Sequence, residues 1–380
     1  WPRWRSSCSE LTAGAPPRAG RSPRAAPAQP PTCRPPPVST PSSDLRVLQV
    51  LGHNDRDGVG QASLELHREL ARRGMQVRTL ALAPGREAGL SAVVPTMSPS
   101  ARSLAAHTQL RREQRWADVV ILRGQVPAAA AGLSRMSGAP PTVLALTDEP
   151  EVWSDVPIPS RVMRLLGRAA AVVVTSPSQT ASADRWHMDP ADVHVIPYGV
   201  TTTDVSDSRR VASRAALGLP ADGVVAHLTR PAADDDGLRA RLEGLGVGIT
   251  VIEPRDDRIV HFGAPEPEDT EELAVAAADV VVSTGPETSG PPWELLRGAA
   301  WGRAVIVDRW PGRAPELRGA LAELLDDSTG WTDLGDAITA GRAEIERRGS
   351  AARRRVAERF SMPTVGAAWA DLLGSLSDRR

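Results

Sequence analysis

The sequence predicts an α/β protein made of two doubly wound domains with parallel sheets. Three observations support this prediction. The chain has 380 residues, which is more than one hydrophobic core normally supports. Short apolar runs alternate with helix-forming stretches, and such strand–helix–strand units produce parallel sheets. The alternation is interrupted once, by a polar, loop-like stretch at 201–215, which marks the expected domain boundary.

The first strand–helix–strand unit is the clearest. The apolar run 45–51 predicts a buried strand, and a glycine-bearing loop at 57–60 follows it. Leucines then recur at the spacing of one helical face over 63–73, and Gly74 ends this helix. The next apolar run, 77–82, predicts the second strand.

Similar apolar runs continue along both halves. The further expected strands are 118–122, 141–146, 170–175, 193–197, 223–228, 248–252, 259–263, 279–283 and 304–308. The expected helices of the second half are 237–245, 269–277, 334–360 and 364–376. We therefore expect an N-terminal domain over 45–205, a C-terminal domain over 206–360, and a final helix in 361–380 that returns to the N-terminal domain.

Residues 1–44 have a different composition. This tail holds eleven prolines, six arginines and both cysteines, Cys8 and Cys33. It offers too little apolar surface to offset the entropy of ordering it, so we expect disorder. It lacks the apolar region of a secretory signal, and it begins with Trp rather than Met. A fragment or a misplaced start codon would explain such a beginning.

The composition excludes several classes of function. The net charge of -1 argues against a nucleic-acid binder. All 45 basic residues are arginines, so Schiff-base chemistry on a lysine is excluded and cationic phosphate contacts must come from arginine. The predicted domains hold no cysteine for a disulfide or a zinc site. No apolar run reaches the length of about 18 residues that a membrane helix needs. We expect a cytoplasmic protein, and the richness in Ala and Arg suggests a bacterial source with GC-rich DNA.

Four segments together resemble a known enzyme family. They are 195–200 (ValIleProTyrGlyVal), 278–283 (AlaAspValValValSer), 302–308 (GlyArgAlaValIleValAsp) and 353–361 (ArgArgArgValAlaGluArgPheSer). In sequence, order and spacing they are similar to motifs of the retaining glycosyl transferase group 1 family, family GT4. The resemblance covers about 45–376.

This resemblance implies the GT-B architecture, in which two Rossmann-like domains face each other across a cleft. It implies a nucleotide-sugar donor on the C-terminal domain and a sugar, lipid or small-molecule acceptor on the N-terminal domain. Transfer retains the anomeric configuration, and no metal or other cofactor is expected. Relatives with lipid acceptors touch the membrane surface, so peripheral contact with the inner membrane is an open expectation. The oligomeric state is not indicated.

The resemblance also assigns roles to individual residues. Negative charge develops on the departing diphosphate, which cations and helix N-termini stabilise. Arg230 matches a family arginine that faces this diphosphate, and Glu287 matches the glutamate that touches the donor sugar. The expected donor-binding residues are Gly58, Val59, Gly60, Arg230, Glu287, Thr288, Ser289, Gly290 and Glu294. The expected acceptor-side residues are Asp148 and Glu149, and the expected catalytic residues are Glu287, Arg230 and Asp148.

Three positions depart from the family pattern. The family has a lysine about five residues after the matching arginine, where this chain has the acidic run 234–236. Thr147 stands where the family commonly has a histidine. A second glutamate is expected eight positions after the first, where this chain has Leu295 or Arg297, depending on the alignment; Glu294 lies beside the first option.

Other interpretations of the same residues stay open. The departures allow a pseudoenzyme that keeps the fold as a binding or partner subunit. The glycines at 58–60 also fit an ordinary strand-to-helix turn, and a loop carboxylate is more often simply solvated. A dinucleotide-dependent oxidoreductase is disfavoured, because Gly58 and Gly60 are followed by Ser63 rather than by the third glycine of the dinucleotide motif. The histidines His187, His194 and His261 have no metal-ligand spacing.

Overall fold

The computed structural model describes residues 44–53, 58–84, 95–97, 104–124, 139–146, 169–175, 180, 192–202, 206–228, 249–252, 267–283, 293–307, 330–331 and 334–378. The expected helix at 237–245, the expected strand at 259–263 and nearly all of the predicted tail lie outside these residues.

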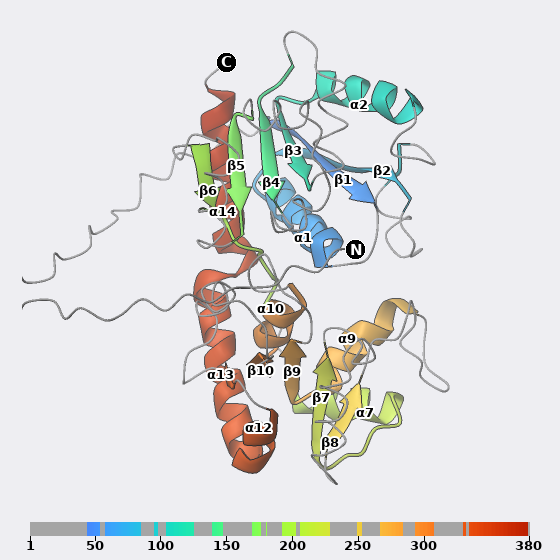
Figure 1. Cartoon of the computed structure of the whole chain (residues 1–380), viewed down its shortest axis with the longest axis vertical. Coiled ribbons are helices and arrows are strands. Elements are labelled where there is room, and N and C mark those ends of the chain that lie inside the picture. The colour runs from blue at the N-terminus through green and yellow to red at the C-terminus, as the bar shows by residue number, and fades with distance from the viewer. Residues whose placement is uncertain are drawn as a thin grey trace, which may run out of the picture. The chain divides into compact units, whose positions relative to one another are not determined.

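The first half of the chain forms a six-stranded parallel sheet with strand order β2-β1-β3-β4-β5-β6 (Figure 1). Its strands are β1 (Arg46–His53), β2 (Gln76–Ala83), β3 (Val119–Arg123), β4 (Thr142–Leu146), β5 (Ala171–Val174) and β6 (Val193–Val195). Every neighbouring pair is parallel. The predicted parallel sheet is confirmed, and the bounds of its strands fall within two residues of the predicted bounds.

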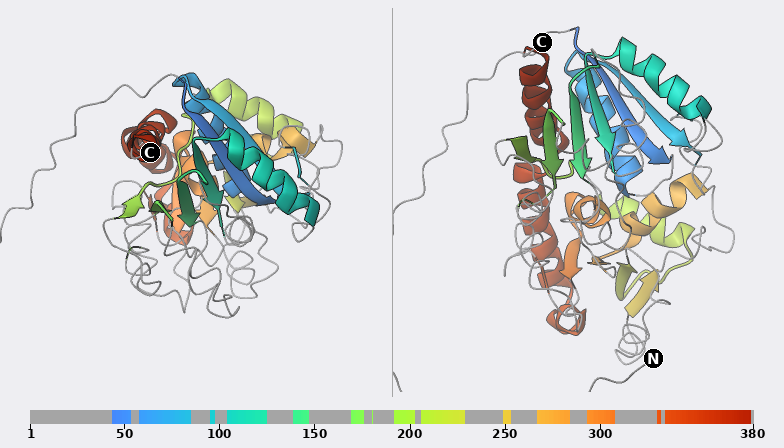
Figure 2. Two further views of the ribbon diagram at one scale, coloured as in Figure 1. Left: turned by 90° about the horizontal axis from the view of Figure 1, so that it is seen from above. Right: turned by 45° about the horizontal axis from the view of Figure 1, so that its top comes forward.

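Helices cover both faces of this sheet (Figure 2). They are α1 (Gly58–Arg72), α2 (Leu104–Trp116) and α14 (Met362–Ser377). Successive strand residues point to opposite faces, so even-numbered residues such as Leu48 and Leu122 pack with Leu110 of α2. Odd-numbered residues such as Val47 and Ile121 pack with α1 and α14. The buried strands are therefore mainly apolar on both faces, as is usual in parallel sheets, with Gln49, Thr79 and Arg123 as buried polar exceptions.

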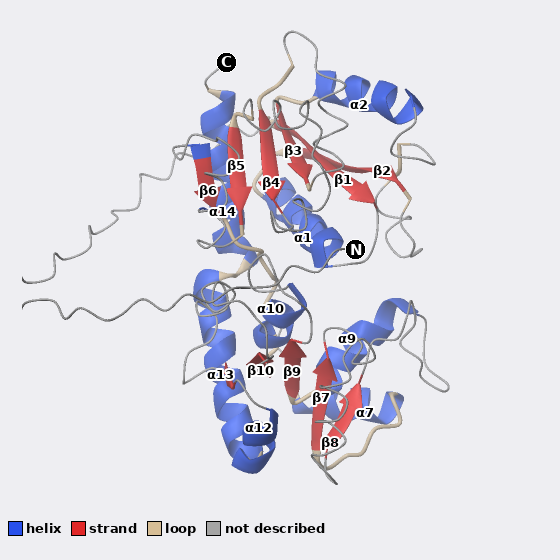
Figure 3. Ribbon diagram, in the orientation of Figure 1, coloured by secondary structure: helices blue, strands red, loops and turns tan. Residues whose placement is uncertain are grey.

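The second half forms a five-stranded parallel sheet with strand order β11-β10-β9-β7-β8. Its strands are β7 (Val224–Leu228), β8 (Ile249–Ile252), β9 (Val280–Ser283), β10 (Ala304–Val307) and β11 (Gly330–Trp331). The helices of this half are α7 (Asp207–Ala216), α9 (Pro267–Ala277), α10 (Trp293–Ala300), α12 (Leu334–Ala340) and α13 (Arg342–Arg359). Helices and parallel strands alternate in β1-α1-β2-α2-β3 and in β8-α9-β9-α10-β10 (Figure 3), and the two parallel sheets confirm the predicted α/β class.

Helix α13 packs closely on the chain around β10. A Cβ atom placed on Gly349 would lie 2.1 Å from the backbone oxygen of Gly302. Glycine is therefore required at position 349, because backbone atoms cannot move aside as a side chain can. The apolar residues Ile345 and Val356 of the same helix are buried. Arg347 pairs with Glu344 at the surface.

Three predicted elements are corrected. The stretch 201–215 was expected to be loop, but α7 begins at Asp207, where the side chain of Ser206 accepts a hydrogen bond from the backbone of Arg209. Such caps stabilise helices with few apolar residues. The single helix expected over 334–360 is two helices, because Gly341 adopts φ 80° between α12 and α13. The glycines of 58–60 belong to the first turn of α1 rather than to a preceding loop.

The C-terminal helix α14 packs against the six-stranded sheet and α1. Its buried Val365, Trp369 and Leu373 belong to the same core cluster as Leu66 of α1. Arg73, just after α1, donates a hydrogen bond of 2.7 Å to the carbonyl oxygen of Pro363. The last helix therefore belongs to the core of the first half, while the residue boundaries of the two domains stay a prediction. Among the described helices, none has the length and apolar character that crossing a bilayer would require.

Candidate functional site

A small cavity lies at the carboxyl edge of the six-stranded sheet, next to α1 and α14. In doubly wound sheets ligands bind at this edge. β3 ends there with Arg123, and Thr175 directly follows β5. These two residues line the cavity together with Leu66, Tyr198 and Trp369, among others. The lining is thus mainly apolar with a few polar groups, and the cavity volume of about 10 Å³ is room for about one water molecule.

Arg123 brings a charged group to this edge. Its side chain is buried, and its Nε donates a hydrogen bond of 3.1 Å to Oε1 of Gln49. The amide of Gln49 in turn donates to the carbonyl oxygen of Ser63, at 2.9 Å, and to Oγ1 of Thr79, at 3.1 Å. The guanidinium lies over the ring of Trp369, 5.5 Å from its centroid. Arg123 is therefore held in one orientation by two strands and two helices.

The start of α1 lies next to the carboxyl end of β1, where the sequence predicted a phosphate-binding loop. The hydroxyl of Ser63 donates to the carbonyl oxygen of Val59 at 2.6 Å, which fixes the first turn containing Gly58 and Gly60. The hydrogen bond from Gln49 to Ser63 ties this turn to β1. A helix N-terminus carries partial positive charge and attracts anions. Gly58, Val59 and Gly60 thus lie at a helix N-terminus, and their role in donor binding stays a prediction.

Glu65 joins α1 to the segment that leaves the first sheet. Its carboxylate accepts hydrogen bonds from the backbone nitrogen of Thr201, at 2.7 Å, and from the Thr201 hydroxyl, at 3.0 Å. Burial raises the pKa of Glu65 despite these two bonds, which favour the charged form. Sequence reasoning missed Glu65, because nothing in a helical glutamate indicates a partner 136 positions away.

Helix α10 carries the residues around the missing second glutamate. Glu294 lies in its first turn and is half-buried. Leu295 is fully buried in the core, so that position could not present a carboxylate without rearrangement. Arg297 lies 5.1 Å from the ring centroid of Trp293 and 5.2 Å from that of Trp301. Among the three positions considered, only Glu294 offers an acidic group near the helix N-terminus.

His227 is a second buried polar residue that sequence reasoning missed. It lies in β7 next to Val281 of β9 and is only 3% exposed. Within the described part of the chain, its Nδ1 has no hydrogen-bond partner. Burial, with a smaller effect of the positive charge of Arg297, lowers the pKa of His227 to about 4. The imidazole is therefore neutral at physiological pH.

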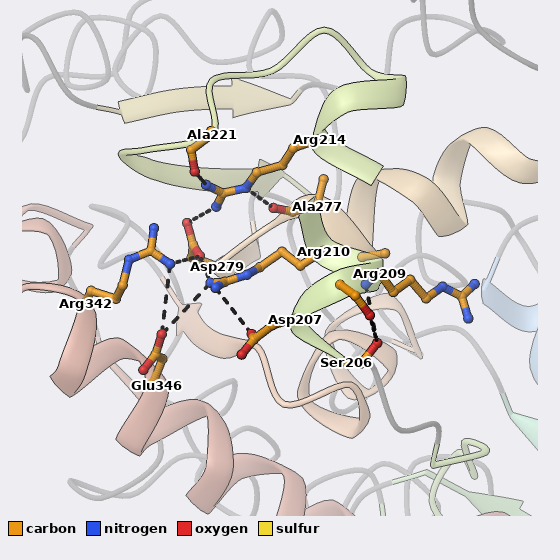
Figure 4. Close-up of polar contacts among 12 residues, drawn as sticks. Ser206, Asp207, Arg209, Arg210, Arg214, Ala221, Ala277, Asp279, Arg342 and Glu346 are labelled. Atoms are coloured by element: carbon orange, nitrogen blue, oxygen red, sulfur yellow. Dashed lines mark hydrogen bonds and ion pairs between the residues drawn. The ribbon is translucent and has the colours of Figure 1, made fainter. Parts of the chain in front are cut away.

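An arginine cluster surrounds Asp279, which precedes β9 (Figure 4). The carboxylate of Asp279 pairs with Arg214 and with Arg210, the latter at 3.0 Å. It also accepts a hydrogen bond of 2.8 Å from the backbone nitrogen of Val225, which follows the first residue of β7. The cluster thus lies at the amino ends of β7 and β9, opposite to the edge where ligands bind. The AlaAsp pair of the segment 278–283 therefore has a structural role.

Most of the predicted site lies outside the described residues. These residues are Asp148, Glu149, Arg230, Glu287, Thr288, Ser289 and Gly290. Their roles stay predictions. Gly58, Val59, Gly60 and Glu294 are described, at the N-termini of α1 and α10. Within the described part of the chain, no group of three or more His, Cys, Asp and Glu side chains is arranged to hold a metal ion.

The two parallel sheets with their helices define the class of the protein: the fold is that of the GT-B glycosyltransferases. It is similar to Anabaena Alr3699/HepE, solved in complex with UDP-glucose, with a TM-score of 0.65 and 16% identity over 87% of this chain and 100% of that chain. A glycosyltransferase from Rickettsia africae ESF-5 has a TM-score of 0.63 and 13% identity, over 89% and 100% of the two chains.

A third similar structure is the sucrose-phosphate synthase (tll1590) from Thermosynechococcus elongatus, with a TM-score of 0.59 and 16% identity over 88% of this chain and 100% of that chain. At the level of sequence, residues 56–204 match the model of Glycosyltransferase Family 4. No curated protein sequence matches the chain. The resemblance to GT-B glycosyltransferases of family 4 type, drawn from four short segments, is confirmed.

Proposed function

We propose that this protein transfers a sugar from a nucleotide-sugar donor to an acceptor with retention of anomeric configuration. The observation that carries the proposal is the combination of the GT-B fold with the family 4 match over 56–204. Support for the donor class comes from HepE, which shares the fold and was solved with UDP-glucose and with UDP. No metal or other cofactor takes part in the proposed reaction.

The proposed chemistry requires stabilisation of a departing diphosphate. The N-terminus of α1, at Gly58 to Gly60, and the N-terminus of α10 each supply partial positive charge. Arg230 adds a full positive charge and the amides of 288–290 add hydrogen-bond donors. Such preorganised groups act mainly on the transition state, where the leaving charge has developed.

The carboxylates have different proposed roles. Glu287 orients the donor sugar, and Glu294 accepts hydrogen bonds from the ribose hydroxyls. The first turn of α10 suits Glu294 for this role, because a carboxylate there is also stabilised by the helix dipole. Asp148 and Glu149 contact acceptor hydroxyls. The N-terminal half thus holds the acceptor.

Substitution of the two residues assigned to the donor tests this proposal. We expect Arg230→Ala to weaken binding of a UDP- or GDP-sugar about tenfold or more, because a charged hydrogen bond to the diphosphate is lost. We expect Glu287→Ala to lower nucleoside diphosphate release more than it lowers donor binding. Calorimetry measures the binding, and a coupled assay measures the release. The control is Arg354→Ala, an exposed arginine of α13. Unchanged donor affinity in Arg230→Ala would show that the diphosphate is bound elsewhere.

A pseudoenzyme is the second candidate. It is favoured by α10, where the buried Leu295 and the cation of Arg297 occupy both positions at which an acidic residue is expected. In that case the chain binds nucleotide-sugars without turnover. Donor binding in calorimetry with no diphosphate release from any donor, with or without candidate acceptors, is the result that selects this alternative.

A further inference from the structure

The chain passes between its two sheets at two places, and these two passages are hydrogen-bonded to each other. The first passage leads from β6 toward α7, and the second leads from α13, which packs on β10, to α14 on the six-stranded sheet. The backbone nitrogen of Val200 donates to the carbonyl oxygen of Phe360 at 2.9 Å, and that of Met362 donates to the carbonyl oxygen of Val200 at 2.9 Å. Val200 and Ser361 thus form a short parallel bridge, which we call the crossing.

Apolar side chains from both sides meet at the crossing. Tyr198, Val200 and Phe360 belong to one buried cluster with Ala62 of α1 and Leu296 of α10, among others. Helix α1 packs on the six-stranded sheet, whereas α10 packs with the strands of the five-stranded sheet. Apolar contacts have no preferred direction. They hold the two sheets together, but a single relative orientation also requires a directional contact.

Glu65 of α1 supplies such a directional contact. Thr201 directly follows Val200, so it is the first residue beyond the crossing on the way to α7. Oε2 of Glu65 accepts a hydrogen bond of 2.7 Å from the backbone nitrogen of Thr201 and one of 3.0 Å from its hydroxyl. Hydrogen bonds to an ionised group are stronger than those between neutral groups. The carboxylate therefore restrains the direction in which the chain leaves the first sheet.

The charges around Glu65 come from both sides of the crossing. Burial disfavours the ionised carboxylate, whereas the positive charges of Arg297 in α10 and Arg68 in α1 favour it. Because α10 packs with the strands of the five-stranded sheet, Glu65 is attracted to a helix of the second half as well as bonded to the passage that leads there. One side chain of α1 thus acts on both.

We propose that Glu65 acts as a latch on the crossing: its ionised carboxylate holds Thr201 and thereby fixes the orientation of the five-stranded sheet relative to the six-stranded sheet. Without this carboxylate the apolar cluster still joins the two sheets, but the second sheet gains freedom to turn about the pairing of Val200 with Ser361. Two units joined by a few chain passages move relative to each other unless their interface is large and apolar. A few residues at such passages absorb the change in backbone angles.

The distance between two spin labels on the full chain tests the latch, and no nucleotide or sugar is needed. Cys8→Ser and Cys33→Ser remove the native thiols, and Ser350→Cys in α13 and Asp371→Cys in α14 place the labels at exposed positions. The two helices flank the crossing and pack on different sheets, so the distance reports the relative orientation of the sheets. We expect a narrow distribution of distances with Glu65 present and a distribution at least about twofold wider in Glu65→Ala.

Two further variants separate the latch from a general loss of stability. Thr201→Val loses the hydroxyl donor but keeps the backbone donor, so it should widen the distribution less than Glu65→Ala does. It leaves α1 unchanged, so it decides the question if Glu65→Ala does not fold. The matched control is Glu113→Ala in α2, where a buried carboxylate accepts a hydrogen bond of 2.8 Å from Arg78 on the side of the six-stranded sheet. We expect this control to keep the narrow distribution.

Three results would overturn the latch. One is an equal width in the labelled chain with Glu65 and in Thr201→Val and Glu65→Ala. Another is a wide distribution already present with Glu65. The third is an equal widening in Glu113→Ala, because it would mean that any lost carboxylate loosens the chain. Sugar transfer plays no part in these measurements, so they are independent of the proposed function.

Discussion

The buried arginines of this chain differ in what surrounds their charge. Arg214 has a carboxylate and backbone oxygens, whereas Arg123 has an amide, an aromatic ring and a cavity. The first arrangement lies at the amino edge of its sheet and ties helices to strands. The second lies at the carboxyl edge. Arg303, buried just before β10 with no hydrogen-bond partner for its Nε among the described residues, shows that this chain also buries an arginine with little compensation away from that edge.

Removing the counter-charge of the structural arginines should be strongly destabilising. Asp279→Asn leaves Arg214 and Arg210 without their carboxylate in a buried place, and we expect a loss of about 3–5 kcal/mol of unfolding free energy. Arg342→Met removes a cation that is 43% exposed and 3.8 Å from Asp279, and it should cost less than about 1 kcal/mol. Urea unfolding of both variants measures the difference. Similar losses in the two variants would contradict the structural role of the cluster.

His227 should make stability depend on pH. Its pKa is lowered to about 4 in the folded chain, from an ordinary value of 6.5. As pH falls, the unfolded chain therefore binds a proton at this imidazole before the folded chain does. The contribution of His227 to the free energy of unfolding is thus complete above pH 6.5 and decreases progressively between pH 6.5 and about pH 4. The free energy of unfolding of the unaltered chain should therefore decrease between about pH 8 and about pH 5. We expect this decrease to be smaller in His227→Leu, which has no imidazole at this position.

Chemical denaturation at the two pH values measures this loss. The same exchange at His53, which is exposed at the end of β1, serves as the control and should leave the loss as in the unaltered chain. An equal pH dependence in His227→Leu and the unaltered chain would mean that the buried imidazole titrates normally.

At the residue scale the sequence predicted only part of the candidate site. Glycines 58–60 were found because they follow a strand and begin a helix, a local pattern. Arg123 was not found, although a charged residue ending an apolar strand was a readable signal. Glu65 and His227 depend on Thr201 and on Arg297, which the fold alone brings near them. Partners distant in sequence leave no local pattern.

At the element scale, two glycines of α14 differ in how closely another helix approaches them. A Cβ atom on Gly366 would lie 2.2 Å from Cγ of Glu69 in α1, whose side chain is buried and paired with Arg73. A Cβ atom on Gly374 of the same helix would meet nothing within 4 Å. The first glycine lets two helices approach, whereas the second is replaceable.

These two glycines give a matched pair of substitutions. We expect Gly366→Ala to destabilise the chain by about 1–3 kcal/mol, because α14 or Glu69 must move. Gly374→Ala should stabilise it by up to about 1 kcal/mol, because alanine favours helix. Thermal and urea unfolding of the two variants measure the changes. A stabilisation in both would show that α14 does not pack against α1 at Glu69.

Elements were predictable where their pattern was local and apolar. The buried strands β1, β3, β4 and β5 were predicted from runs of Val, Ile and Leu, which mark parallel strands. The helices α2 and α7 were missed. Both are polar, and α7 depends on the Ser206 cap and on ion pairs such as Arg210 with Asp279. Tertiary contacts of this kind override weak local preference.

At the scale of the whole molecule, the GT-B fold is the frame for the proposed donor and acceptor sites. The fold was predictable because two series of apolar strands are separated by one polar stretch, and because four short segments resembled family GT4 in order and spacing. The activity was less predictable, because it depends on a few loop residues and three of them depart from the family pattern. Fold alone does not define function, which lies in the site.

The most direct test of retaining sugar transfer is proton NMR of the reaction mixture. The full chain is incubated with α-linked UDP- and GDP-sugars and a panel of neutral and acidic acceptors, and the anomeric proton of each product is followed over time. We predict consumption of one donor and a first-formed product with the α configuration, with Glu287→Ala much slower under the same conditions. A β-configured first product would contradict retention. No consumption of any donor, together with no donor binding, would contradict the proposed transfer itself.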